Sequence, residues 1–111
     1  MDKKLMSIGI SMLVLKLLDE KEMYGYQVIK ELEARSERVF ELKEGTLYPI
    51  LHLLEEKLAV TSYEKQTKAG RTRKYYQITK QGKRLLEEKT KEWELYQQAV
   101  SNVLRGVTTF A

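Results

Sequence analysis

Apolar residues recur at helical spacing in three stretches of the first sixty positions. The first stretch, about 4–19, holds ten apolar residues between Leu5 and Leu18, a stripe broader than one neighbouring helix covers. We therefore expect a helix buried on more than one side, which is a first indication of a second copy of the chain. Helical spacing also predicts helices at about 25–36 and about 46–57. Thr46 is the expected N-cap of the third helix, which places Pro49 in its first turn.

The pattern then changes to β-branched and aromatic residues. The segments at about 60–66 and 73–78 are typical of strands, and Gly70 between them is a turn residue. Two short helices with a short connection, followed by a hairpin, indicate a winged helix-turn-helix. The expected fold class is therefore mainly α with a small β-hairpin (α+β).

A long final helix begins after Thr79, which is expected to cap it. Its apolar positions step by threes and fours, with Lys89 in the single polar position, so they form a stripe like that of a coiled coil. We expect residues 1–78 to form the winged helix-turn-helix and 79–111 a dimerisation helix, within one compact domain. The alternative is that the first and last helices pair within one chain. Ile8, Met12, Leu15, Leu86, Trp93, Tyr96, Val100 and Val103 are the expected dimer-interface residues, and Val107 continues the stripe.

Positive charge is concentrated in the predicted hairpin and just after it. The segment from Glu64 to Arg84 has eight basic residues and one acidic residue, a net charge of +7. The whole chain carries +4, so the other ninety residues sum to −3. A basic ribbon on a nearly neutral body suits a wing that contacts DNA phosphates. A polar hairpin that merely avoids edge-to-edge pairing is the alternative.

Composition excludes several classes of function. The chain has no cysteine and one histidine, so disulfides, zinc fingers and histidine-based catalytic triads are not expected. No phosphate loop or nucleophile–base pair occurs, and we expect neither an enzyme nor a metal or cofactor. The N-terminus resembles a signal peptide, but Lys16 interrupts the apolar run and acidic residues follow it. The run is also too short to span a bilayer, so a cytoplasmic protein without a membrane partner is expected.

The exposed face of the third helix is the expected site of DNA reading. This face lacks Asn, Gln and Arg, so few direct base contacts and much dependence on DNA shape are expected. Alternatively, Tyr48 packs against the wing or the first helix and contacts no DNA. The expected DNA contacts are Lys43, Thr46, Tyr48, Pro49 and His52 on this helix, and Lys65, Lys68, Arg71, Arg73 and Lys74 on the wing.

Several runs together resemble the PadR family of bacterial transcriptional regulators. They are Tyr24-Gly25-Tyr26, the run from Glu41 to Leu51, Leu54-Glu55-Glu56-Lys57, and Arg73-Lys74-Tyr75-Tyr76 with Thr79 and Gly82. The short C-terminal part resembles the compact branch with a single long dimerisation helix. The resemblance implies a homodimer that binds a pseudo-palindromic operator, usually as a repressor, and places Tyr24 and Tyr26 at the DNA backbone. It also implies release of DNA by small aromatic compounds.

Two positions depart from the family pattern. His52 and Leu53 stand where basic residues are common, and Leu58 stands where a helix-ending glycine is usual. A left-handed Leu58 would cost about 1 kcal/mol. The resemblance also offers Trp93 and Tyr96, with Lys89 at the mouth, as a pocket for a flat ligand. We favour the simpler role of Trp93 as filler of the dimer interface. A winged-helix module that binds protein instead of DNA is the alternative function.

Overall fold

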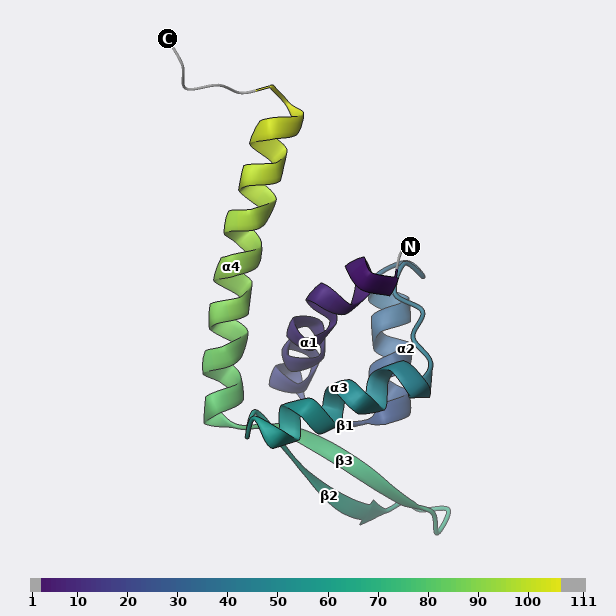
Figure 1. The fold of residues 1–111 in the computed structure, drawn as a ribbon. Coiled ribbons are helices and arrows are strands. Elements are labelled where there is room, and N and C mark those ends of the chain that lie inside the picture. The colour runs from purple at the N-terminus through teal and green to yellow at the C-terminus, as the bar shows by residue number, and fades with distance from the viewer. Residues whose placement is uncertain (1–2, 107–111) are drawn as a thin grey trace.

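Four helices and a three-stranded sheet make up the computed structural model, which describes residues 3–106 and, for residues 3–8, the backbone only (Figure 1). Helices α1, α2 and α3 lie over one face of the sheet, and α4 rises from the end of β3. The expected fold class is confirmed. The elements in chain order are α1 (Lys3–Glu20), β1 (Met23–Tyr24), α2 (Gly25–Arg35), α3 (Glu44–Glu56), β2 (Val60–Gln66), β3 (Thr72–Ile78) and α4 (Lys80–Leu104).

The sheet has one strand more than the sequence predicted. The two-residue strand β1 pairs antiparallel with β3, so that Met23 lies opposite Tyr76, and the strand order is β1-β3-β2. This pairing fixes the entry to α2 against the hairpin. None of the described helices combines the length and apolar character needed to cross a membrane.

The start of α3 differs from the prediction. The expected N-cap Thr46 lies inside the helix, because the carbonyl of Lys43 already accepts hydrogen bonds from the backbone of Thr46 and Leu47, at 3.0 and 3.1 Å. Lys43 is the N-cap, and it makes no side-chain capping bond. Pro49 consequently lies within the helix and not in its first turn. A proline there supplies no N–H, so the carbonyl of Gly45 has no helical donor.

The core lies between the inner face of the sheet and the three helices. Met23, Val60 and Tyr76 from the sheet are almost fully buried, and Leu51 of α3 is 0% exposed. The interior excludes water around Tyr76, and this burial raises the pKa of its phenol.

Helix α1 is buried on more than one side, but by its own chain. Leu15 is 0% exposed in the core, so the prediction that it contacts a second subunit is wrong. The breadth of the apolar stripe therefore does not require a second copy, because α2, α3, α4 and β3 cover it. Met12 is half-buried, and the side chain of Ile8 lies outside the described residues.

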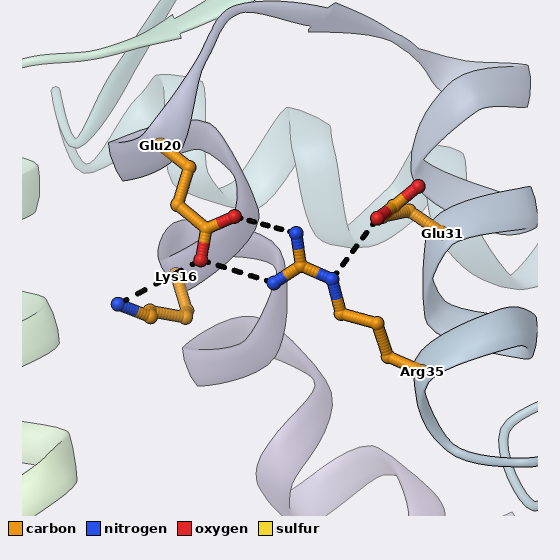
Figure 2. A network of polar contacts seen from close by, with 4 residues as sticks. All are labelled: Lys16, Glu20, Glu31 and Arg35. Atoms are coloured by element: carbon orange, nitrogen blue, oxygen red, sulfur yellow. Dashed lines mark hydrogen bonds and ion pairs between the residues drawn. The ribbon is translucent and has the colours of Figure 1, made fainter.

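An exposed ion-pair network joins the ends of α1 and α2 (Figure 2). The Arg35 guanidinium contacts Glu20 with two nitrogens and donates from Nε to Glu31 at 3.0 Å, while Lys16 lies 3.8 Å from Glu20. The hydrogen bond from Arg35 lowers the pKa of Glu20, and the same pairing raises the pKa of Arg35. Exposed pairs contribute little individually, so the network adds only modestly to the packing of α2 on α1.

Helix α4 packs on the body only along its first part. Thr79 caps it as predicted, by accepting a hydrogen bond from the backbone of Gly82 at 3.0 Å. Leu86, an expected interface residue, is half-buried against the subunit's own core. The outer part of α4 extends away from the body, and the molecule is 67 Å long (Figure 1). Val107 lies outside the described residues.

Candidate nucleic-acid interface

The tip of the hairpin is a tight, basic turn. The backbone of Thr67 donates to the carbonyl of Arg71 at 2.7 Å, and Gly70 donates back to Thr67 at 2.9 Å. Gly70 has a φ of +81°, which glycine adopts without steric cost. Lys68 and Arg71 are both exposed in this turn. The turn thus presents two cations at the outermost point of the wing.

Cross-strand pairing divides the remaining wing cations between two faces. Lys65 lies opposite Arg73 and Tyr63 opposite Tyr75, so all four share the face directed away from the core. Lys74 lies on the other face, where its ammonium is 3.8 Å from Glu55 of α3. The structure therefore places Lys74 apart from the other wing cations, in a contact that joins the wing to α3.

The outward face of the hairpin carries a cluster of three tyrosines. The rings of Tyr63 and Tyr75 stack with centroids 5.7 Å apart, and Tyr24 meets Tyr75 edge-on at 5.3 Å. The Arg73 guanidinium lies 4.3 Å from the centre of the Tyr24 ring, and the Lys65 ammonium lies 5.4 Å from that of Tyr75. Such cation–π contacts restrict the long basic side chains while leaving them charged. This cluster was not predicted from the sequence, although Tyr63 and Lys65 alternate along β2 and Arg73 and Tyr75 alternate along β3, which is a signal for one shared face.

A carboxylate just before β1 anchors the same face. Glu22 accepts a hydrogen bond from the Gln77 side chain at 2.7 Å and another from the Tyr63 hydroxyl. These bonds lower the pKa of Glu22 and raise that of Tyr63 to about 12. The hydroxyl of Tyr63 is therefore held as a donor to the segment that enters the helix-turn-helix.

Four wing cations have no acidic partner among residues 3–106, namely Lys65, Lys68, Arg71 and Arg73. Farther along the basic segment, Lys83 pairs with Asp19 at 3.8 Å. The free positive charge of the described chain is thus strongest on the outer half of the wing.

Helix α3 presents part of the expected reading surface. Lys43, Thr46, Pro49 and His52 are exposed. Tyr48 is half-buried, and its hydroxyl lies 2.7 Å from the position that a Cβ on Gly25 would occupy. Tyr48 therefore packs against the start of α2, and its contact with DNA stays a prediction.

The two tyrosines at the start of α2 lie in different environments. Tyr24 is half-buried beneath Arg73, and its backbone N–H donates to the side chain of Gln27 at 3.2 Å, closing the first turn of α2. Tyr26 is 51% exposed, with the Lys30 ammonium 5.5 Å from its ring centre. Tyr26 is thus the more accessible of the two expected backbone contacts.

The expected ligand-pocket residues do not enclose a cavity in a single subunit. The Trp93 and Tyr96 rings lie 6.0 Å apart on α4, and both are exposed. An open apolar hollow begins at Tyr96 but runs toward the end of the helix, away from Trp93 and Lys89. Its lining residues are Tyr96, Ala99, Val100, Val103 and Leu104.

Comparison with known proteins agrees with this arrangement. A transcriptional regulator of known structure from Clostridium thermocellum is 28% identical and superposes with a TM-score of 0.83, over 90% of this chain and 97% of that one. A PadR family transcription regulator from Clostridium difficile R20291 is 37% identical with a TM-score of 0.74, over 86% of this chain and 98% of that one. Uncharacterized protein X of Lysinibacillus sphaericus is 36% identical over 86% of this chain and 87% of its own length.

The model of one protein family matches most of the chain. The match covers residues 14–88, from α1 through the helix-turn-helix and the wing into the first part of α4. Members of this family are transcription regulators and not enzymes, in agreement with the absence of any catalytic motif in the sequence. The chain therefore belongs to the transcriptional regulator PadR-like family.

Proposed function

We propose that this regulator is a repressor that binds a pseudo-palindromic DNA operator as a homodimer in the cytoplasm. The observation that carries the proposal is the set of unpaired cations on the outer wing, Lys65, Lys68, Arg71 and Arg73. Phosphate contacts provide most of the affinity of such proteins, and the cations on a narrow ribbon can follow the DNA backbone.

Helix α3 supplies the reading contacts in this proposal. Thr46 and His52 offer polar groups to base edges or phosphates, and the exposed ring of Pro49 suits a thymine methyl group. Acidic residues at both ends of the helix, Glu44 and Glu56, disfavour close approach of phosphates there. Specificity therefore depends on a short central contact together with DNA shape at the wing.

The second half of α4 supports a homodimer. Trp93, Tyr96, Val100 and Val103 are exposed on one stripe of the part of α4 that extends beyond the body. A two-fold partner would bury this stripe and close the assembly. Light scattering should give about twice the 13.1 kDa of one chain; a mass near one chain at micromolar concentration would refute the dimer.

A small planar aromatic compound is the effector that we propose to release the DNA. It would bind between the paired α4 helices near Trp93 and Tyr96, with Lys89 at the entrance. Trp93 is the only tryptophan, so its fluorescence reports directly on this place. If none of a chemically diverse set of planar dyes quenches the Trp93 fluorescence, the protein has no planar aromatic effector at this place.

The wing tests the DNA-binding proposal against the alternative of a protein-binding module. Arg71→Ala should weaken binding to all DNA sequences and reduce the slope of log affinity against log salt by about 0.9 for each lost phosphate contact. Lys91→Ala removes the same charge from the exposed side of α4 and serves as the matched control. Equal salt slopes for wild type, Arg71→Ala and Lys91→Ala would favour the protein-binding module.

A further inference from the structure

The end of α3 and the start of α4 are joined by hydrogen bonds across the base of the hairpin. Three successive carbonyls just after α3, those of Lys57, Leu58 and Ala59, all accept from the first turn of α4 or its cap. Gln81 donates from its side chain to Lys57 at 2.9 Å, and the hydroxyl of Thr79 donates to Leu58 at 2.6 Å. The backbone of Thr79 donates to Ala59 at 3.0 Å.

The left-handed conformation of Leu58 contributes to this junction. Leu58 has a φ of 60°, and the backbone N–H groups of Leu58 and Ala59 donate to Glu55 and Leu54, a Schellman ending of α3. The reversal directs the last carbonyls of α3 toward α4. An unstrained continuation of α3 would leave the donors of Thr79 and Gln81 without these acceptors.

Gly82 allows the two helices to approach at backbone distance. A Cβ at this position would lie 2.0 Å from the carbonyl oxygen of Ala59 and 2.7 Å from the side chain of Ile78. Gly82 is buried, and its own N–H donates to the Thr79 hydroxyl at 3.0 Å. Any larger residue must therefore displace the start of α4 from the end of α3.

We infer that this junction, formed by Thr79, Gln81 and Gly82, is a specificity-determining element that sets the half-site spacing recognised by the dimer. The inference rests on the proposed function, because α3 would read each half-site and α4 would join the subunits. Since the junction fixes the direction of α4 relative to α3, it also fixes the separation and rotation of the two α3 helices. None of the three residues needs to contact DNA for this role.

Operator selection from a library with a randomised spacer measures this role directly. The wild-type dimer should prefer one spacing by about tenfold over a spacing longer or shorter by one base pair, because one pair displaces and rotates the second half-site. Gly82→Ala should bind a different spacing or several spacings with similar affinity, while its salt slope stays that of the wild type. An unchanged preference in a dimeric Gly82→Ala protein would overturn the inference.

A milder pair of variants covers the case in which Gly82→Ala does not fold. Thr79→Val combined with Gln81→Ala removes the side-chain donors to Leu58 and Lys57 without adding volume, and should also broaden the spacing preference. Thr79→Ser keeps the hydroxyl and should select as the wild type does. If the double variant is folded and prefers the same half-site spacing as strongly as the wild type does, the junction does not set the spacing.

A distance measurement within one chain separates failure of the inference from failure of the proposed function. The sequence has no cysteine, so His52→Cys on α3 and Gln98→Cys on α4 allow two spin labels to be placed. The labelled protein is diluted with unlabelled protein, so that only distances within one chain are measured. With Thr79 and Gln81 intact, the distance between the two labels should have one narrow distribution. With Thr79→Val and Gln81→Ala, that distribution should be shifted or broadened. This result requires neither DNA nor dimer formation. Identical distributions in both backgrounds would show that the junction does not orient α4.

Discussion

The winged-helix body and the outer half of α4 bury apolar side chains to opposite extents. In the body, Leu51 and Leu15 are fully buried within one chain. In the outer half of α4, which we call the arm (residues 93–104), Val103 and Leu104 are more than 70% exposed. The difference shows that the body forms a complete core by itself, whereas the arm presents an apolar stripe that only another molecule can cover.

A cavity in the body should have the largest effect. Leu51→Ala removes a fully buried side chain beneath the sheet and should lower the free energy of unfolding by about 3 kcal/mol. The loss should be the same at all protein concentrations, because the affected contacts lie within one chain. Urea unfolding followed by circular dichroism at two concentrations measures it. A loss that appears only in dilute protein would show that the body also depends on a partner.

Truncation of an apolar side chain in the arm should weaken self-association and leave the stability of the single chain unchanged. Trp93→Ala should weaken self-association by about 2 kcal/mol, or roughly thirtyfold in the dissociation constant, through lost apolar burial. The unfolding midpoint of dilute monomer should not change. Analytical ultracentrifugation over a concentration series gives the constant. Leu95→Ala is the control, because Leu95 is equally apolar but lies on the far side of the helix from the stripe. An equal effect of both variants would show that the stripe is not the pairing face.

The sequence alone predicted the helices and the hairpin of the body, but not all of the contacts between them. Helix spacing and β-branched runs located the three body helices and the hairpin because these signals are local. Strand β1 was missed because two residues carry no periodicity, and its pairing with Tyr76 is a long-range contact. Leu15 was assigned to the wrong surface because a broad stripe does not show which neighbour covers each position.

The sequence predicted the positive charge of the candidate site, but not the faces and contacts of its side chains. The basic run from Lys65 to Arg73 was visible in the sequence. The position of Lys74 on the other face of the hairpin depends on the strand register. The cap of α3 was misplaced, because Thr46 is a better capping residue than Lys43, although the helix begins with the backbone of Lys43. The contact of Tyr48 with Gly25 requires the packing of α3 on α2, which one sequence does not contain.

Relief of backbone strain at the boundary between body and arm should have a smaller effect. Leu58 is left-handed and 66% exposed, so Leu58→Gly removes strain and loses little burial. The strain relief exceeds the added entropy of the unfolded glycine, and stability should rise by up to about 1 kcal/mol. Thermal unfolding by calorimetry measures the gain. Leu53→Gly, at a helical position in the last turn of α3, should instead destabilise the protein. A loss of stability in Leu58→Gly would mean that its side chain packs usefully in the assembled protein.

The smallest expected effect is on the pH dependence of the body. The pKa of Glu22 is lowered by its bonds to Tyr63 and Gln77, so its contribution to stability is present above the unfolded pKa and is lost as the pH falls through the lower folded value. The pKa of Tyr63 is raised to about 12, so its contribution is present below the unfolded pKa of about 10 and is lost as the pH rises toward 12.

Glu22→Gln tests the interaction between the Glu22 carboxylate and the Tyr63 hydroxyl. The variant removes the charged acceptor of the Tyr63 hydroxyl, so the pKa of Tyr63 should fall from about 12 toward the ordinary value of about 10. Tyrosinate absorbance after a rapid pH jump, with Tyr63→Phe subtracted, isolates this one phenol among seven. Glu88→Gln, on the exposed side of α4, removes an equal charge and should leave that difference titration unchanged. If Glu22→Gln also leaves it unchanged, Glu22 does not hold the wing to the entry of α2, and the rigidity of the outer wing must come from the stacked tyrosines and their cations alone.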